Sequence, residues 1–152
     1  MISTEHVVCE LPFTVRRTVK WGQCDPAGVV YTVVFAEYVI STAELFYGSL
    51  FGQGPQQAKD EYQFGTPTRG LTFDFRKSLR PDDLFDTEVR VGRIGTSTYQ
   101  LLMHARDMEG DTVFTACLTP ICIVRGQRES ISIPEHFKEK LKVHQSSDAP
   151  ES

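Results

Sequence analysis

Apolar and polar residues alternate at the start of the chain and then change to a helical spacing. Residues 13 to 21 alternate in this way, which predicts a strand with Phe13, Val15 and Trp21 on one face. From 33 to 50, apolar residues recur three and four positions apart and predict a long helix. They form two adjacent stripes, so we expect other elements to enclose this helix.

From residue 69 onward, apolar side chains recur at every second position, which predicts four further strands. These strands are expected at 71–75, 85–91, 99–105 and 113–123. Residues 109–111 (Glu-Gly-Asp) predict a hairpin turn, and Pro120 a bulge or an edge position. The connections are too short for crossovers, so the strands should pair antiparallel. A single sheet curled around the helix is the economical packing.

The remaining segments predict minor elements. Short helices are expected at 56–62 and from Pro134, and the polar residues 145–152 should be a disordered tail. A chain of 152 residues fits one domain, 1–152, with an ordered core from about 12 to 143.

Composition and charge exclude several classes of protein. The chain has 40% hydrophobic and 24% charged residues, a net charge of -4 and no basic stripe, which argues against a nucleic-acid partner. No apolar run of membrane-spanning length stands out, and residues 1–10 lack the apolar core of a signal peptide. We therefore expect a cytoplasmic protein without a membrane partner. The four cysteines and four histidines show no metal-ligand spacing, so no metal site is expected.

The polar segment 21–31 contains the most informative residue, Asp25. It lies just before the expected helix start, where free amides and the positive end of the helix dipole favour a developing negative charge. A carboxylate in this position is a candidate for hydrolytic chemistry. Asp25 with Pro26 and Gly28 also makes an ordinary turn, and Cys24 is a rival nucleophile, although a buried thiol is the simpler interpretation.

Residues 24–31 read Cys-Asp-Pro-Ala-Gly-Val-Val-Tyr, and this segment resembles the signature of the 4-hydroxybenzoyl-CoA thioesterase family. The resemblance extends from about Phe13 to Phe137. It implies an α+β hotdog fold, in which a five-stranded antiparallel sheet wraps around one long central helix. It also implies hydrolysis of a small or aromatic acyl-CoA, with coenzyme A as part of the substrate and no cofactor. The family's cleft lies between two subunits, so the resemblance implies a homodimer that pairs further into a homotetramer.

The resemblance implies roles for individual residues by position. Asp25 corresponds to the catalytic carboxylate, which acts as nucleophile or as general base on water. Thr32 corresponds to the residue whose backbone amide polarises the thioester carbonyl. The substrate-binding candidates are Gly28, Val29, Tyr31, Phe35, Arg93, Arg125 and Arg128. The three arginines are chosen on charge alone, as contacts for the nucleotide of coenzyme A.

Simpler interpretations accompany several of these residues. Core packing explains Tyr31 and Phe35 nearly as well as an acyl pocket, and the Thr32 side chain is most simply a helix N-cap. Two helix acids that offer an alternative base, Glu37 and Glu44, also suit polar positions at a dimer seam. His104 is expected to face solvent, opposite the apolar face of its strand.

Other functions of the same fold stay open. A thioesterase that acts on acyl groups tethered to a carrier protein is the second enzyme class, and a non-catalytic acyl-CoA binder is the third. A hydratase or dehydratase is less consistent with the chain, because that chemistry usually needs a histidine near the helix and none lies there.

Overall fold

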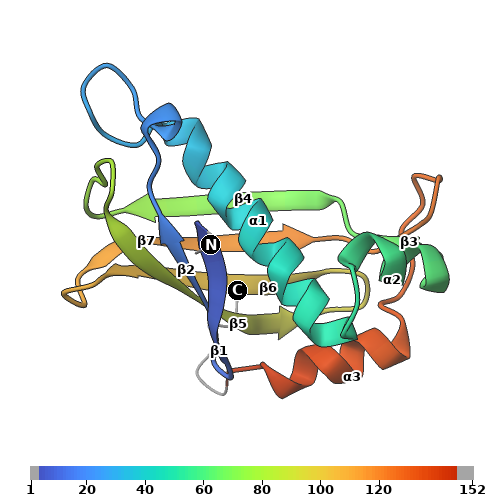
Figure 1. Cartoon of the computed structure of the whole chain (residues 1–152). Coiled ribbons are helices and arrows are strands. Elements are labelled where there is room, and N and C mark those ends of the chain that lie inside the picture. Colours follow the sequence, from blue (N-terminus) through green and yellow to red (C-terminus); the bar gives the residue numbers. More distant parts are fainter. Residues whose placement is uncertain (1–3, 147–152) are drawn as a thin grey trace.

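A six-stranded antiparallel sheet curves around one long helix in the computed structural model, which describes residues 4–146 (Figure 1). The strand order is β1-β2-β5-β6-β7-β4. The bounds are β1 Glu5–Glu10, β2 Phe13–Thr18, β4 Thr68–Phe75, β5 Leu84–Ile94, β6 Tyr99–Asp107 and β7 Thr112–Pro120. The arrangement is the hotdog fold implied by the resemblance, with six strands instead of five.

Short elements complete the chain. They are the 3-10 turn η1 Trp21–Gln23, the helices α2 Pro55–Tyr62 and α3 Glu135–Val143, and the strands β3 Phe64–Gly65 and β8 Ile123–Val124. The last two pair with each other as a small second sheet. α2 and α3 lie at the end of the sheet where α1 finishes (Figure 1). The two short helices were predicted within a few residues of these positions.

The central helix, α1, spans Thr32–Phe51, close to the predicted 33–50. It ends at Gly52, whose φ of 64° is the left-handed conformation that glycine adopts without strain. One face of α1, including Phe35, Val39 and Phe46, is buried against the sheet. Judged only by its length and mean hydropathy, α1 could cross a membrane, whereas no such segment was expected from the sequence. In the structure the sheet encloses α1 as a core helix (Figure 1).

The inner face of the sheet follows the predicted alternation. Phe13 and Val15 of β2, Phe85 and Val89 of β5, and Leu101 of β6 are fully or almost fully buried. Their aromatic members meet aromatic rings of α1, as in the Phe13–Phe46 pair with ring centroids 5.4 Å apart. Burial of this apolar face drives the sheet to curl around the helix.

Three expectations from the sequence differ from the structure. Trp21 was placed on a buried strand face, but β2 ends at Thr18 and the Trp21 side chain is 81% exposed in η1. β7 ends at Pro120 instead of continuing to residue 123, because proline cannot donate to the ladder. The expected tail begins with two ordered residues: Gln145 Nε2 donates to Gly92 O, and residues 147–152 lie outside the described part.

The sixth strand, β1, was not predicted. It forms a hairpin with β2 through Leu11 and Pro12, and most of its residues are exposed. Because β1 covers the outside of β2 and not the core, its sequence shows no clear alternation. Its residue Glu5 nevertheless reaches the buried polar network described below.

Candidate active site

Asp25 lies in the loop that joins η1 to α1, which projects beyond the sheet at the upper left of Figure 1. The loop is closed at its neck by two contacts between its arms. Cys24 and Val30 form an isolated antiparallel bridge, and the Tyr31 amide donates to Gln23 O at 2.9 Å. These contacts hold the loop as one compact turn directly in front of the helix.

Asp25 also organises the turn itself. Its amide donates to Val29 O, its carbonyl accepts from the Gly28 amide, and its Oδ1 accepts from the Ala27 amide, each at 2.9 Å. Gly28 supports this geometry with a φ of +81°, which a side chain would strain. Within residues 4–146, the second carboxylate oxygen, Oδ2, accepts no hydrogen bond. The interpretation of Asp25 as a turn residue is therefore correct for Oδ1, whereas Oδ2 takes no part in the turn.

The start of α1 is open to a ligand. Tyr31 is the N-cap residue, and no side chain caps the helix. The Val34 amide already donates to Tyr31 O, whereas the amides of Thr32 and Val33 precede the helical ladder and have no acceptor within it. The interpretation of Thr32 as an N-cap hydroxyl is wrong, because Thr32 is the first helical residue and its side chain is exposed.

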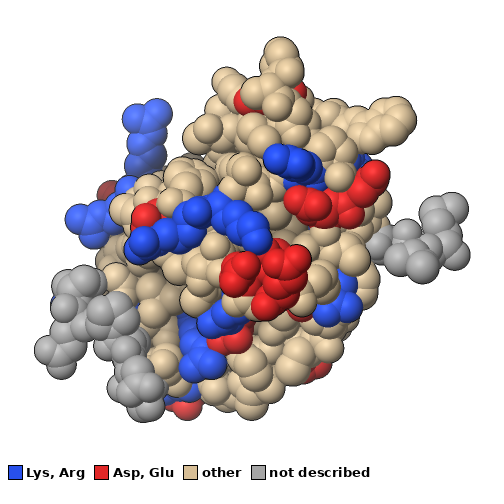
Figure 2. All heavy atoms as spheres, turned by 90° about the vertical axis from the view of Figure 1, so that its left-hand side faces the viewer, with Lys and Arg blue, Asp and Glu red and all other residues tan. Residues whose placement is uncertain are grey.

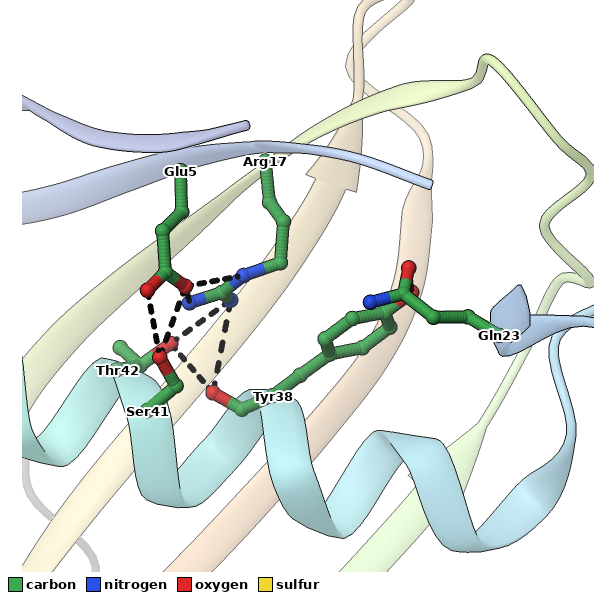
Figure 3. A network of polar contacts seen from close by, with 6 residues as sticks. All are labelled: Glu5, Arg17, Gln23, Tyr38, Ser41 and Thr42. Carbon is green, nitrogen blue, oxygen red and sulfur yellow. Dashed lines mark hydrogen bonds and ion pairs between the residues drawn. The ribbon is translucent and has the colours of Figure 1, made fainter. Parts of the chain in front are cut away.

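Gln23 ties the loop to the helix through its side chain (Figure 3). The Tyr38 hydroxyl donates to Gln23 Oε1 at 2.7 Å, and the same oxygen accepts from the Lys20 amide at 2.9 Å. Burial raises the pKa of Tyr38 well above its usual range, so the hydroxyl stays a donor. Sequence reasoning missed both residues, because nothing in the spacing of Gln23 and Tyr38 shows that their side chains meet.

A buried arginine continues the connection to the first strand (Figure 3). Arg17 is 4% exposed, and its guanidinium lies 5.2 Å from the centre of the Tyr38 ring. It donates to Glu5 Oε2 at 2.5 and 3.0 Å and to Thr42 Oγ1 at 3.1 Å. Ser41 Oγ also donates to the Glu5 carboxylate. The network joins β1, β2, α1 and the Asp25 loop into one polar unit.

If Asp25 is the catalytic carboxylate that the resemblance implies, this network makes Tyr38 a positioning residue for it. We expect Tyr38→Phe to lower kcat about tenfold, because the loop loses the hydrogen bond that fixes Gln23 while the ring packing remains. KM should change little, and the free energy of unfolding should fall by about 1 kcal/mol. Steady-state kinetics and chemical denaturation measure the two effects. A kcat equal to that of the wild type would show that the contact is only structural.

The other side chains considered as a nucleophile or base have different surroundings from Asp25. Burial, together with the nearby charges of Asp25 and Asp83, raises the pKa of the Cys24 thiol and so disfavours its thiolate. Glu37 and Glu44 are exposed on α1. His104 does lie on the outer face of the sheet, where its Nε2 is 2.7 Å from Thr112 Oγ1. Asp25 is thus the acid carried by the loop that leads into the helix.

The two aromatic residues proposed to bind substrate, Tyr31 and Phe35, differ in exposure. Phe35 is buried against Tyr38, Phe75 and Phe114, so it belongs to the core. Tyr31 is 52% exposed beside the loop. Val29 is half-buried and Gly28 exposed, both in the Asp25 turn.

The arginine candidates also separate. Arg93 lines a cavity of about 340 Å³ together with Arg69, Thr96 and Ser97, at the turn between β5 and β6. Arg69 comes from an irregularity in β4, where the register with β7 shifts, and no pattern in the sequence indicated it. Arg125 forms an ion pair with Asp60 of α2 instead, and Arg128 is exposed in the loop after β8.

One acidic cluster has metal-like spacing. Oxygen atoms of Asp107, Glu109 and Asp111 lie within 4.8 Å of one another in the β6–β7 hairpin. Lys77 Nζ is 2.5 Å from Asp107 Oδ2 and 3.3 Å from Asp111 Oδ2, so an ammonium group already pairs with both of these carboxylates. Figure 2 shows basic and acidic side chains adjoining on this end of the molecule, with a largely uncharged region above them. The cluster is a hairpin ion-pair group.

Comparison with known proteins places this geometry in context. The model of the thioesterase-like superfamily matches residues 19–141. A thioesterase-superfamily protein from Jannaschia sp. CCS1 is similar in structure, with a TM-score of 0.82 and 21% identity over 97% of this chain and 100% of that one. A Staphylococcus aureus protein in complex with CoA gives a TM-score of 0.81 and 14% identity, over 99% and 93%.

A third similar structure is a 1,4-dihydroxy-2-naphthoyl-CoA thioesterase from Synechocystis, with a TM-score of 0.77 and 19% identity over 91% of this chain and 98% of that one. At these identities the three structures establish a shared fold. A comparison with curated protein sequences gives no match.

Proposed function

The chain belongs to the thioesterase-like superfamily, and we propose that it hydrolyses small or aromatic acyl-CoA thioesters to the free acid and CoA. One observation carries the proposal. The Asp25 carboxylate has an oxygen, Oδ2, outside the hydrogen bonds of its turn, and it lies in the loop that leads directly into an uncapped helix N-terminus. An acid and an anion site are thereby supplied by one short segment.

Hydrolysis of a thioester needs few catalytic groups beyond an acid and an anion site. A thioester carbonyl is weakly stabilised by resonance and its thiolate leaves readily, so no histidine is required to protonate the leaving group. Asp25 attacks the carbonyl carbon directly or removes a proton from the attacking water. The Thr32 amide donates to the carbonyl oxygen as it gains negative charge, a contribution of roughly 3–4 kcal/mol for one such donor.

The cavity at Arg69 and Arg93 is proposed to hold the phosphates of CoA. Two guanidinium groups beside serine and threonine hydroxyls match the charge and the acceptors of a phosphorylated nucleotide. This favours CoA over a carrier protein as the source of the thiol. A protein complexed with CoA is among the similar structures, which supports the same assignment.

Substitution of Arg69 tests the nucleotide site. We expect Arg69→Gln to raise KM for an acyl-CoA about tenfold, the loss of one charge-assisted hydrogen bond, with little change in kcat. The same acyl group on pantetheine, which lacks the nucleotide, should show no change. Arg128→Gln is the matched control, and a larger effect there than at Arg69 would move the nucleotide to the β8 loop.

The active unit is proposed to be a homodimer formed along β4. This strand is the edge of the sheet beside β7, so one side of its backbone has no neighbouring strand within the described residues. Large apolar side chains are exposed on the same flank: Phe75 is 46% exposed at the end of β4, and Val33 and Ile40 are 55% and 41% exposed on α1. Antiparallel pairing of β4 with its copy satisfies the backbone and covers these residues.

A charge on this flank should separate the subunits. We expect Ile40→Glu to weaken the dimer roughly 100-fold or more, because each subunit would bury an unpaired carboxylate. Val143→Glu, at a 65% exposed position on α3, should leave the assembly unchanged. Sedimentation over a concentration series reports the mass as a multiple of 17.2 kDa. It also tests the proposed tetramer, and an Ile40→Glu protein of wild-type mass would place the interface elsewhere.

Thiol release measured over matched esters tests the activity. We expect the purified protein to release thiol from aromatic and short-chain acyl-CoAs faster than from the same acyl groups on a carrier protein. Cleavage of carrier-bound groups alone would replace the CoA assignment. Binding of acyl-CoA without any hydrolysis would make the protein a binder and not an enzyme.

A further inference from the structure

A second cavity lies beside the C-terminal half of α1, away from Asp25 within the same subunit. It measures about 320 Å³ and is bounded by α1, α2, the start of β4 and the end of β7. Its walls combine apolar side chains, among them Ile40, Tyr47 and Leu118, with the polar side chains of Glu44 and Gln56. The proposed catalytic chemistry does not use any of these residues.

Lys59 contributes a positively charged side chain to the lining of this cavity. The Lys59 ammonium lies 4.8 Å from the centre of the Tyr47 ring, and burial lowers the pKa of Lys59. Among residues 4–146, Lys59 forms no direct ion pair, but the Glu44 carboxylate, which also lines the cavity, acts on it electrostatically and partly offsets the effect of burial on the pKa of Lys59. A half-buried ammonium without a directly bound anion favours a ligand that brings a negative charge.

The cavity is too far along α1 to serve Asp25 of its own subunit. Ile40 lies eight residues beyond Thr32 and Tyr47 fifteen, which is about 12 to 22 Å at 1.5 Å per helical residue. In the proposed β4 dimer the cavity of the partner subunit is the closer one. β4 starts at Thr68, beside the cavity, and ends at Phe75, whose ring is 5.1 Å from that of Phe35 in the first turn of α1.

Antiparallel pairing of β4 therefore brings unlike ends of two subunits together. The start of the partner's β4 comes to lie beside Phe75, and the Lys59 cavity comes with it. The cavity then faces the helix start and the Asp25 loop across the interface. A substrate carbonyl held at Thr32 would direct its acyl group toward this cavity.

We propose that Lys59 of the opposite subunit binds a negatively charged oxygen at the far end of the acyl group. Preferred substrates are then acyl-CoAs with a distal carboxylate or ionised ring hydroxyl, and the apolar side chains of the cavity hold the ring or chain between the two ends. The inference rests on the proposed thioesterase activity and dimer, and it adds the chemical class of the acyl group.

Two benzoyl-CoA substrates that differ only in the para substituent, one charged and one neutral, test the selectivity. We expect kcat/KM for 4-carboxybenzoyl-CoA to exceed that for 4-methylbenzoyl-CoA roughly 10- to 100-fold, the range for a hydrogen bond to a charged group. The same measurement with 4-hydroxybenzoyl-CoA, at pH values below and above the pKa of its ring hydroxyl, shows whether Lys59 prefers the carboxylate or the ionised hydroxyl. Lys59→Met should abolish the preference and Lys59→Arg should retain most of it. Lys142→Met, on the exposed face of α3, is the control.

Mixed dimers test whether the cation acts across the interface. When Asp25→Asn and Lys59→Met subunits are combined, a heterodimer has one site with both Asp25 and the opposite Lys59 intact. Activity on the carboxylated substrate should therefore rise above that of Lys59→Met alone. No rise would overturn the placement in the opposite subunit.

The outcomes keep the two proposals apart. If both benzoyl esters are cleaved equally well, or if Lys59→Met keeps the preference, the inference fails and the thioesterase stands. If no CoA ester is cleaved at all, the proposed function fails, and the acyl-group assignment falls with it.

Discussion

Asp25→Asn is expected to lower kcat about 1000-fold, within the range for loss of a general base, with KM and the fold unchanged. Asparagine keeps the side-chain oxygen that accepts from the Ala27 amide, so the turn is preserved. Only the charge and the basicity are removed. Thiol release under saturating substrate, with circular dichroism as a check on folding, measures the effect.

Two comparisons separate chemistry from turn formation. If Asp25 served only the turn, Asp25→Asn would be nearly fully active and Asp25→Ala would be impaired by the lost hydrogen bond. If Asp25 is the catalyst, both variants are inactive to a similar degree. Asp107→Asn is the matched control, because its Oδ1 also accepts from the amide two residues further on, that of Glu109, in the β6–β7 hairpin.

The second large effect is expected on stability. Glu5→Gln should lower the free energy of unfolding by about 2–3 kcal/mol, because the guanidinium of Arg17 would stay buried without its counter-ion. Loss of one member of a buried pair typically costs 3–5 kcal/mol, and the value here is smaller because the Glu5 side chain is 35% exposed. Chemical denaturation at neutral pH measures the difference. Glu139→Gln, in an exposed pair with Lys142, should change little.

The stability difference should depend on pH. Burial by itself raises the pKa of Glu5, but hydrogen bonds from Arg17 and Ser41 outweigh it and hold that pKa below its usual 4.5. A lowered folded-state pKa means that ionised Glu5 stabilises the fold above the unfolded-state value. That stabilisation is lost as the pH falls through the folded-state pKa. Wild type and Glu5→Gln should therefore converge at acid pH, and a constant gap would assign the effect to packing.

Much of the fold was predictable because each element that lines the core has its own repeating pattern of buried residues. The alternation in residues 85–91 and 99–105 and the double stripe of α1 each report one buried face, and the structure has these elements within a few residues. β1 was missed because its side chains are largely exposed and its backbone pairs with β2 alone. Trp21 was misplaced because the alternation continues past Thr18 although the backbone turns there.

Residues of the candidate site could be predicted from the sequence only where they lie in one continuous segment. Asp25 and Thr32 lie seven positions apart around a turn signal, so their neighbourhood was visible in the sequence. The contact of Gln23 with Tyr38 crosses from the loop to the second turn of the helix, and Arg69 meets Arg93 only when β4 joins the sheet. Such meetings depend on tertiary packing, which spacing does not reveal.

The two borders of the sheet differ, and this limits how the protein can polymerise. β1 is interrupted by an irregularity between Val7 and Cys9 and carries charges at both ends, features that discourage further strands from adding. In the proposed dimer the two β4 edges pair with each other, and only the β1 edges stay unpaired. Strand addition then ends at two molecules and gives no route to open-ended fibres, so the proposed tetramer has to use a surface other than a strand edge.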